Sequence, residues 1–201
     1  MILRRVHVRM RREKMQLFFS LVGDGGGDTL LDVGGAPGFG TEFQDMATRF
    51  RFRCSMNLNA NQARDSGGWP VVGDGCQMPF ATASFDWVFS NAVIEHVGSR
   101  EQQRLFAAEI RRVARKGYFV ATPNRNFPVD PHTLLPFFQY FSHDYQKLLC
   151  RIAPRKWIRE KPQAVDLLSA EQLRSLFPGA KVFGLGLPIA NNNLVAMFRS
   201  A

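Results

Sequence analysis

The feature that most constrains the fold is a glycine-rich turn between a short apolar run and a helix-forming segment. Residues 30–33 are too few for a globular helix and are typical of a buried strand. The turn at residues 34–40 follows directly, and residues 41–47 have the apolar spacing of a helix, with Thr41 and Gln44 at capping-box spacing. Glycines allow close backbone approach and a helix N-terminus offers free N–H donors, so this segment predicts a nucleotide-binding cradle.

The glycine spacing excludes two common phosphate-binding loops. The dinucleotide pattern G-x-G-x-x-G is not met, because Ala36, Pro37 or Phe43 stands at a required glycine, depending on the frame. The P-loop pattern G-x-x-x-x-G-K-[ST] does not occur in the sequence. The pattern that fits is Asp-x-Gly-x-Ala-x-Gly at residues 32–38.

Further strand candidates alternate with helical segments along the chain. The periodicity predicts a helix over residues 100–115, ended by Gly117, and a loop over residues 60–68. Such alternation favours a doubly wound parallel sheet. The strand candidates are residues 50–56, 69–72, 84–90 and 118–121.

The last part of the chain has a different pattern. A helix that begins after Ser169 is predicted to end before Pro178. Two apolar runs follow, residues 181–187 and residues 193–198, which we interpret as a closing antiparallel hairpin. We predict one domain over residues 1–201.

Length and composition limit the class of protein. The 201 residues, 45% of them hydrophobic, suit one globular α/β domain. Cys54, Cys76 and Cys150 form no C-x-x-C pair, which favours a reducing, cytoplasmic setting and predicts no metal site. The sequence has no apolar stretch near the length of about 18 residues expected of a membrane-spanning helix.

The chain is strongly basic. Its formal net charge is +9, which favours contact with nucleic acid, membrane headgroups or an acidic substrate, although an ordinary basic protein has the same balance. Residues 1–28 are expected to form a basic helix and a linker. The helix docks on the domain or covers the cofactor cleft, with a phosphate-binding arm as the functional alternative. The basic residues before the apolar part of this helix are Arg4, Arg5, Arg9, Arg11, Arg12 and Lys14.

Three segments together resemble class I S-adenosylmethionine-dependent methyltransferases, in particular methyltransferase type 11. Residues 32–38 resemble the family's motif I, usually Asp/Glu-x-Gly-x-Gly-x-Gly, with Ala36 in place of the middle glycine. Residues 73–80 are similar to Gly-Asp-Ala-x-x-Leu-Pro-Phe, and residues 84–97 to Ser-Phe-Asp-x-Val-x-Ser-x-x-Val-Leu-Glu-His. The resemblance implies a Rossmann-like, seven-stranded, mostly parallel sheet with a C-terminal antiparallel hairpin and helices on both faces.

The resemblance also implies S-adenosylmethionine as the cofactor and assigns its amino acid end. Gly34, Gly35 and Gly38 would let the backbone wrap the methionine part. Asp32 would interact with the amino acid moiety, directly or through water. Leu58 and Asn91 are implied as further cofactor-binding residues.

At the adenine end, the resemblance implies that Asp74 accepts a hydrogen bond from the adenine amino group. Gly75 or Cys76 would supply a backbone N–H to a ring nitrogen, and Met78 or Phe80 would pack on the adenine face. Taken alone, Asp74 between two glycines is also typical of a turn residue.

The sequence departs from the family at the end of the second strand. An acid usually accepts hydrogen bonds from both ribose hydroxyls there, whereas this chain has Asn57, or Asn59 if the register shifts. An amide oxygen still accepts but lacks the charge that strengthens such a bond. We therefore expect cofactor binding to persist, weakened by about 1 kcal/mol, and Asn57→Asp to tighten it.

Residues 123–136 resemble a Pro-Asn-Arg-x-Phe-Pro-x-Glu-Pro-His-Thr-x-x-Pro segment in one branch of these enzymes, with Asp130 at the glutamate position. The resemblance makes this loop the acceptor wall, with His132 either a general base or a structural anchor. His96 is a second candidate base, although we expect it to be buried beneath the cofactor instead. Residues 125–165 are interpreted as an acceptor-side insertion or lid, with a basic membrane-surface contact or ordinary packing as alternatives.

These observations predict an S-adenosylmethionine-dependent methyltransferase whose acceptor is a small molecule, lipid- or glycan-linked ones included. A nucleic-acid methyltransferase is an alternative that the charge supports, although the sequence has no Asn/Asp-Pro-Pro-Tyr/Phe segment and no Pro-Cys nucleophile. A catalytically silent, methyltransferase-like binding module is a third hypothesis, motivated by Ala36 and Asn57. The expected location is cytoplasmic, with contact to an anionic membrane surface as an option.

Overall fold

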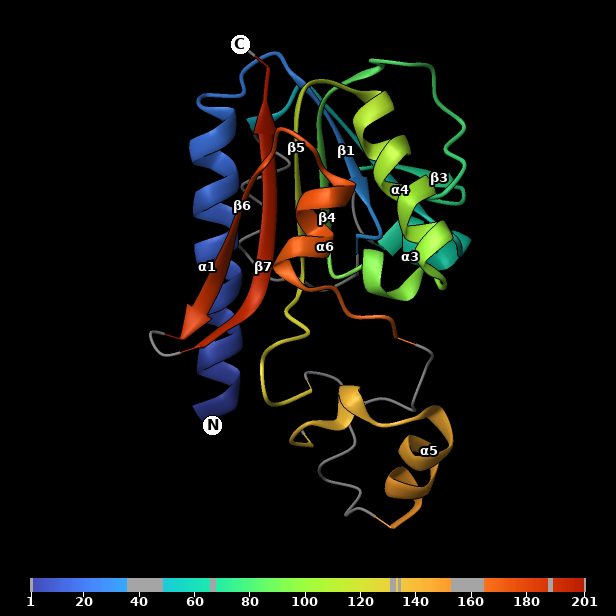
Figure 1. The fold of residues 1–201 in the computed structure, drawn as a ribbon. Coiled ribbons are helices and arrows are strands. Elements are labelled where there is room, and N and C mark those ends of the chain that lie inside the picture. The colour runs from blue at the N-terminus through green and yellow to red at the C-terminus, as the bar shows by residue number, and fades with distance from the viewer. Residues whose placement is uncertain are drawn as a thin grey trace.

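A computed structural model describes residues 2–35, 49–65, 68–130, 133, 135–152, 165–187 and 190–200 (Figure 1). In this part of the chain, seven strands form one sheet in the order β3-β2-β1-β4-β5-β7-β6. The strands are β1 (Thr29–Val33), β2 (Phe52–Asn57), β3 (Trp69–Val72), β4 (Phe85–Asn91), β5 (Ala114–Pro123), β6 (Lys181–Leu187) and β7 (Ala190–Arg199). The helices are α1 (Ile2–Val22), α3 (Ala60–Asp65), α4 (Arg100–Val113), α5 (His143–Ile152) and α6 (Ala170–Leu176), with 3₁₀ turns η2 (Ile94–His96) and η3 (Phe138–Tyr140).

The sheet has the predicted topology. Strands β1 to β5 pair in parallel, whereas β7 runs antiparallel to both β5 and β6. The strand order turns back at β1, which lies between β2 and β4. In an open α/β sheet, ligands bind beyond the carboxyl ends of the strands at such a switch point.

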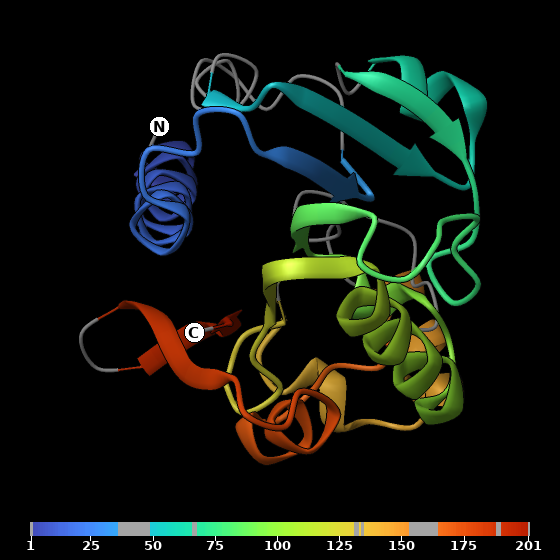
Figure 2. The same cartoon turned by 90° about the horizontal axis from the view of Figure 1, so that it is seen from above.

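Helices cover both faces of the sheet, as predicted (Figure 2). On one face, the apolar side of α1 buries Met15, Phe18 and Leu21 in a cluster that also contains Phe89 and Phe119 of the sheet. The ring of Phe18 lies 5.0 Å from that of Phe89 and 5.7 Å from that of Phe119, measured between centroids. The basic N-terminal segment is therefore a helix that docks on the domain.

On the other face, α4 and α6 pack against the sheet in a second core cluster. Phe106 and Ile110 of α4 are fully buried, as are Leu173 of α6 and Phe177 directly after it. The predicted cap of α6 is confirmed, because Ser169 and Gln172 form a capping box. The predicted helix over residues 41–47, with its cap at Thr41 and Gln44, lies outside the described residues.

The predicted boundary between α4 and β5 is wrong. The helix predicted over residues 100–115 ends at Val113, and β5 begins at Ala114, where the backbone turns extended and pairs with Phe85. Gly117 lies inside β5: a Cβ there would meet the Trp87 ring at 2.7 Å and also clash with the backbone oxygen of Phe198. Close packing therefore requires this glycine, which does not end the helix.

The predicted loop over residues 60–68 is also wrong, because α3 occupies its first part. The Asn59 side chain accepts a hydrogen bond from the backbone N–H of Asn61 at 2.8 Å, and Ala63 is fully buried. A side-chain cap and one buried small residue thus form a helix too short to show apolar periodicity. Among the described helices, none is both long and apolar enough to cross a membrane.

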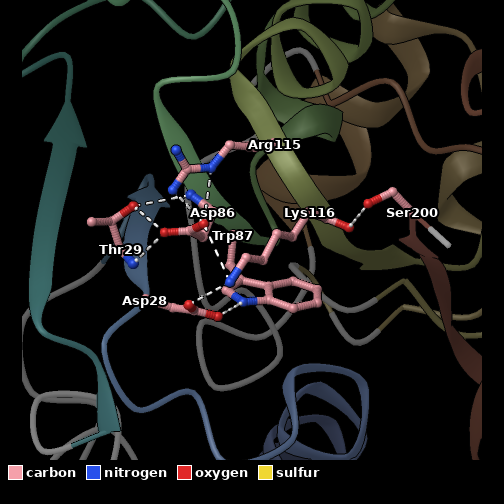
Figure 3. A network of polar contacts seen from close by, with 7 residues as sticks. All are labelled: Asp28, Thr29, Asp86, Trp87, Arg115, Lys116 and Ser200. Carbon is pink, nitrogen blue, oxygen red and sulfur yellow. Dashed lines mark hydrogen bonds and ion pairs between the residues drawn. The ribbon is translucent and has the colours of Figure 1, made fainter.

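Asp86 joins the starts of β1, β4 and β5 at the amino edge of the sheet (Figure 3). Its Oδ2 accepts hydrogen bonds from the backbone N–H and the hydroxyl of Thr29 at 2.9 and 3.0 Å, and its Oδ1 lies 2.6 Å from the guanidinium of Arg115. Burial raises the pKa of Asp86, but the hydrogen bonds from Thr29 and Arg115 outweigh it and lower the pKa to about 2. The Phe-Asp pair of the family-like segment thus has a structural role.

Asp28 completes the same network (Figure 3). It accepts hydrogen bonds from the indole N–H of Trp87 at 2.8 Å and from the ammonium of Lys116 at 2.6 Å. The backbone oxygen of Lys116 in turn accepts from the backbone N–H of Ser200 at 2.8 Å. The amino edge is therefore fixed from β1 through to the residue after β7, and the cavity described below lies at the opposite edge.

We expect Asp86→Asn to destabilise the fold by about 2 kcal/mol at pH 7, because it removes a carboxylate whose pKa is lowered from 3.8 to about 2. A depressed pKa gives stability above pH 3.8 that disappears as the pH falls toward 2, so the difference from wild type should shrink over that range. Urea unfolding at several pH values measures it. Asp24→Asn, at an exposed acid, is the control; an equal loss at pH 7 and near pH 2 would contradict the assignment.

Candidate functional site

A cavity of about 370 Å³ lies at the carboxyl edge of the sheet, at the switch point beside β1. Its size and position are typical of small-molecule sites in α/β folds. The lining residues come from the ends of β1 and β2, α3, the loop after β3, the segment around η2, and α4. They are Val33, Gly34, Met56, Asn57, Leu58, Gln62, Gly73, Asp74, Gly75, Cys76, Val93, His96, Val97, Gln102 and Phe106.

The turn after β1 brings bare backbone to this cavity. Gly34 has a positive φ of 76°, and a Cβ there would collide with the side chain of Val93 across the cavity edge. Its N–H donates to the backbone oxygen of Met56 at 2.8 Å. A Cβ on Gly35 would lie 2.5 Å from Oδ2 of Asp32 and 3.0 Å from Oγ of Ser55. Both positions therefore accept only glycine without rearrangement.

Asp32 lies beneath this turn and is not among the residues that line the cavity. Its carboxylate is 1% exposed and accepts a hydrogen bond from Nη2 of the buried Arg53 at 2.9 Å. Burial raises the pKa of Asp32, and the Arg53 guanidinium offsets only part of that rise. In this structure Asp32 supports the turn from below, and its contact with the cofactor's amino acid moiety stays a prediction.

Asn57, at the end of β2, lines the cavity and is 8% exposed. Its Nδ2 donates a hydrogen bond to the backbone oxygen of Gly35 at 3.0 Å. An aspartate, which the family usually has there, cannot make this donation. The amide thus ties the end of β2 to the glycine turn and leaves Oδ1 as an acceptor. Leu58, the next residue, lines the mouth and is 77% exposed.

The loop after β3 supplies another part of the cavity wall, with Asp74, Gly75 and Cys76, and their contacts with the adenine stay predictions. Oδ1 of Asp74 accepts a hydrogen bond from the backbone N–H of Cys76 at 2.8 Å. Asp74 therefore stabilises the turn between the two glycines and also lines the cavity. The N–H of Cys76 is therefore engaged, and that of Gly75 is the better candidate donor to a ligand. Burial, followed by the Asp74 charge, raises the pKa of the Cys76 thiol to about 11, which argues against a reactive thiolate.

The predicted adenine-packing residues lie elsewhere. Met78 is buried in the core, and Phe80 packs edge-on against Phe85 with 4.9 Å between ring centroids; neither lines the cavity. Phe106 of α4 lines the cavity instead, and a Cβ on Gly75 would lie 2.6 Å from its ring. Sequence periodicity marks Phe106 only as an inward-facing residue of a helix, so this contact could not be predicted.

Asn91, at the end of β4, does not line the cavity, and its Oδ1 accepts a hydrogen bond from Lys14 of α1 at 2.8 Å. His96, expected beneath the cofactor, lines the wall with its side chain 30% exposed. Gly38 and His132 lie outside the described residues. Lys14 was not predicted as a site residue, because the sequence shows it only as one cation among several.

Residues 31–121 match a protein family described as a methyltransferase domain. A curated relative, an uncharacterized methyltransferase from Mycobacterium sp. (strain JLS), is 38% identical over 80 residues, which cover 36% of this chain and 30% of the relative. The chain matches less than a third of the length of the curated relatives.

Two solved structures are similar to this fold. The chain aligns with a SAM-dependent methyltransferase from Methanosarcina mazei at a TM-score of 0.61 and 13% identity, covering 90% of this chain and 95% of that one. It aligns with the magnesium protoporphyrin IX methyltransferase from Synechocystis PCC 6803, which has SAH bound, at a TM-score of 0.65 and 12% identity, covering 98% and 85%. Residues 31–121 thus match a methyltransferase domain, and the chain has the class I fold seen in S-adenosylmethionine-dependent methyltransferases.

Proposed function

We propose that the whole protein transfers a methyl group from S-adenosylmethionine to a small-molecule acceptor, lipid- or glycan-linked molecules included. The observation that carries the proposal is the cavity in which Gly34, Asn57 and Asp74 meet, because all three lie within the residues that match a methyltransferase domain. One fold can host enzymes for many substrates, so the fold alone does not identify the methyl acceptor.

The residues present fit the cofactor. The Gly34–Gly35 turn leaves no room for a Cβ, which is what close contact between backbone and ligand requires. Asp74 keeps its second carboxylate oxygen for the adenine amino group, and Oδ1 of Asn57 can accept from a ribose hydroxyl. S-adenosylmethionine supplies a methyl group already activated on a sulfonium sulfur. The protein's main contribution is therefore to align the acceptor and exclude water.

A general base is needed only where the acceptor must lose a proton early, and we propose His132 for that role. Its sequence neighbours Asp130 and Thr133 are buried, and Oδ1 of Asp130 accepts hydrogen bonds from the N–H and hydroxyl of Thr133 at 2.7 and 2.9 Å. Asn124, at the start of this loop, donates from Nδ2 to the backbone oxygen of Asn191 at 2.7 Å. These bonds anchor the loop to itself and to β7.

Residues 125–165 are proposed as the acceptor-side element. Figure 1 shows residues 125–130, 133 and 135–152, which the structure describes, extending beyond the carboxyl edge of the sheet. Lys147 and Arg151 accompany exposed apolar side chains there, a combination that suits an apolar acceptor carried near an anionic lipid surface. The exposed apolar residues are Phe137, Tyr140, Phe141, Tyr145, Leu148 and Ile152.

Binding of S-adenosylmethionine by the full chain, measured by calorimetry, tests this proposal. We expect measurable binding and a loss of about fivefold or more in Asp74→Ala, because the variant removes a hydrogen-bond acceptor from the cavity wall. Asp24→Ala, at an exposed acid, should bind like wild type. Absence of binding by the wild-type protein would contradict the proposal.

Two further measurements separate the alternatives. Binding without methyl transfer to any of a panel of soluble and vesicle-embedded acceptors would favour a silent binding module. The net charge of +9 is consistent with a nucleic-acid acceptor. Binding of RNA or DNA that weakens steeply with salt would favour such an acceptor over a small molecule.

The hydrogen bond from Asn57 to Gly35 reverses the expectation for Asn57→Asp. The aspartate loses this donation and places a carboxylate against the backbone oxygen of Gly35, so we now expect weaker, not tighter, cofactor binding. Titration of Asn57→Asp, with Asn57→Ala beside it, measures the difference. Tightening by about fivefold in Asn57→Asp would show that the acid's contact with the ribose outweighs the link to the turn.

A further inference from the structure

Lys14 of α1 is buried at the carboxyl edge of the sheet. It lies beside Met15 on the face of the helix that packs on the sheet, and it is only 9% exposed. Figure 1 shows the amino-terminal half of α1 at the same end of the molecule as the carboxyl end of β1. Lys14 follows that half of the helix, and its ammonium lies at the carboxyl edge because it is held to Asn91 at the end of β4.

The charge of Lys14 is incompletely compensated by the described residues. Its ammonium has three N–H donors, and within the described ranges the structure gives it one acceptor, the amide oxygen of Asn91, and no carboxylate at ion-pair distance. Burial lowers the pKa of Lys14 to about 8, against a smaller opposing effect of Glu95, so the ammonium is still mostly protonated at pH 7. A buried charge of this kind is normally paired, which indicates an anionic group from a ligand.

The described part of the cavity wall, in turn, lacks a cation that could pair with a carboxylate of the ligand. The described residues that line it include no lysine or arginine, although the amino acid end of S-adenosylmethionine has a carboxylate. Arg53 is nearby but donates to Asp32. Asn91 is two residues before Val93, and Ser90 pairs with Val33, which precedes Gly34. Lys14 is thus tied to the part of the cavity wall formed by Gly34 and Val93.

We propose that Lys14 donates a charge-assisted hydrogen bond to the α-carboxylate of bound S-adenosylmethionine, with Asn91 holding the ammonium in place. The adenine end of the cofactor lies at Asp74, so its amino acid end lies toward Gly34 and the ammonium. The basic N-terminal helix is then part of the cofactor site, which explains why one of its cations is buried. The inference rests on the cofactor site proposed above.

The test compares two ligands by calorimetry: S-adenosylmethionine and decarboxylated S-adenosylmethionine, which lacks only the carboxylate. We expect Lys14→Met to weaken the binding of S-adenosylmethionine by about tenfold or more, because the lost hydrogen bond is charge-assisted. The affinity for decarboxylated S-adenosylmethionine should change by less than about twofold. Methionine keeps an unbranched apolar stem without burying a charge, so we expect the variant to unfold at or above the wild-type temperature. Arg9→Met removes the same charge from an exposed position of α1 and is the matched control.

The two-ligand design separates this inference from the proposed function. If the wild-type protein binds neither ligand, the proposed cofactor site fails. If the wild-type protein binds both, and Lys14→Met either leaves both affinities unchanged or lowers both equally, the cofactor site remains and the contact from Lys14 to the carboxylate is overturned. A loss in Arg9→Met as large as in Lys14→Met would also overturn it, because the effect would then be one of net charge.

Discussion

The site depends on the close approach of the Gly34–Gly35 turn to the ends of β1 and β2. The turn has almost no space around it: Val93 lies against Gly34, and Asp32 and Ser55 lie beneath Gly35. Because the turn occupies no side-chain volume, the cavity can extend along bare backbone at the switch point of the sheet. Polar bonds hold the turn in place, namely the Asp32–Arg53 pair that underlies it and the donation from Asn57 to Gly35.

Much of this arrangement could be predicted from the sequence, because the local patterns are strong. The sheet is predicted by the apolar run at β1, the glycine turn and the family-like segments that follow in order. The same patterns predict that Gly34, Asn57 and the loop from Asp74 lie at one edge of this sheet. The helix boundary at Val113 was mispredicted because the need for Gly117 arises from strands distant in sequence, at Trp87 and Phe198. The start of α3 depends on one side-chain cap, which apolar periodicity does not detect.

The site residues that were missed depend on tertiary contacts. Phe106 has the same spacing as any inward-facing helical residue, and only the packing of α4 brings its ring to the cavity. Lys14 is one of several cations before the apolar part of α1. The residues around it in the sequence do not indicate that its ammonium bonds to Asn91 at the end of β4. The role of Asn57 depends on the direction of its amide, which links two loops that the sequence separates by about twenty residues. All three contacts join segments that are distant in the sequence.

In the proposed binding mode, one cavity holds the cofactor, with the adenine at Asp74 and the amino acid end at Gly34. A crystal structure of the full chain with S-adenosylhomocysteine would show the orientation of the ligand. We expect the adenine amino group within hydrogen-bond distance of Asp74, a ribose hydroxyl at Asn57 and the carboxylate at Lys14. A ligand bound in the reverse orientation, or outside the cavity beside β1, would contradict it.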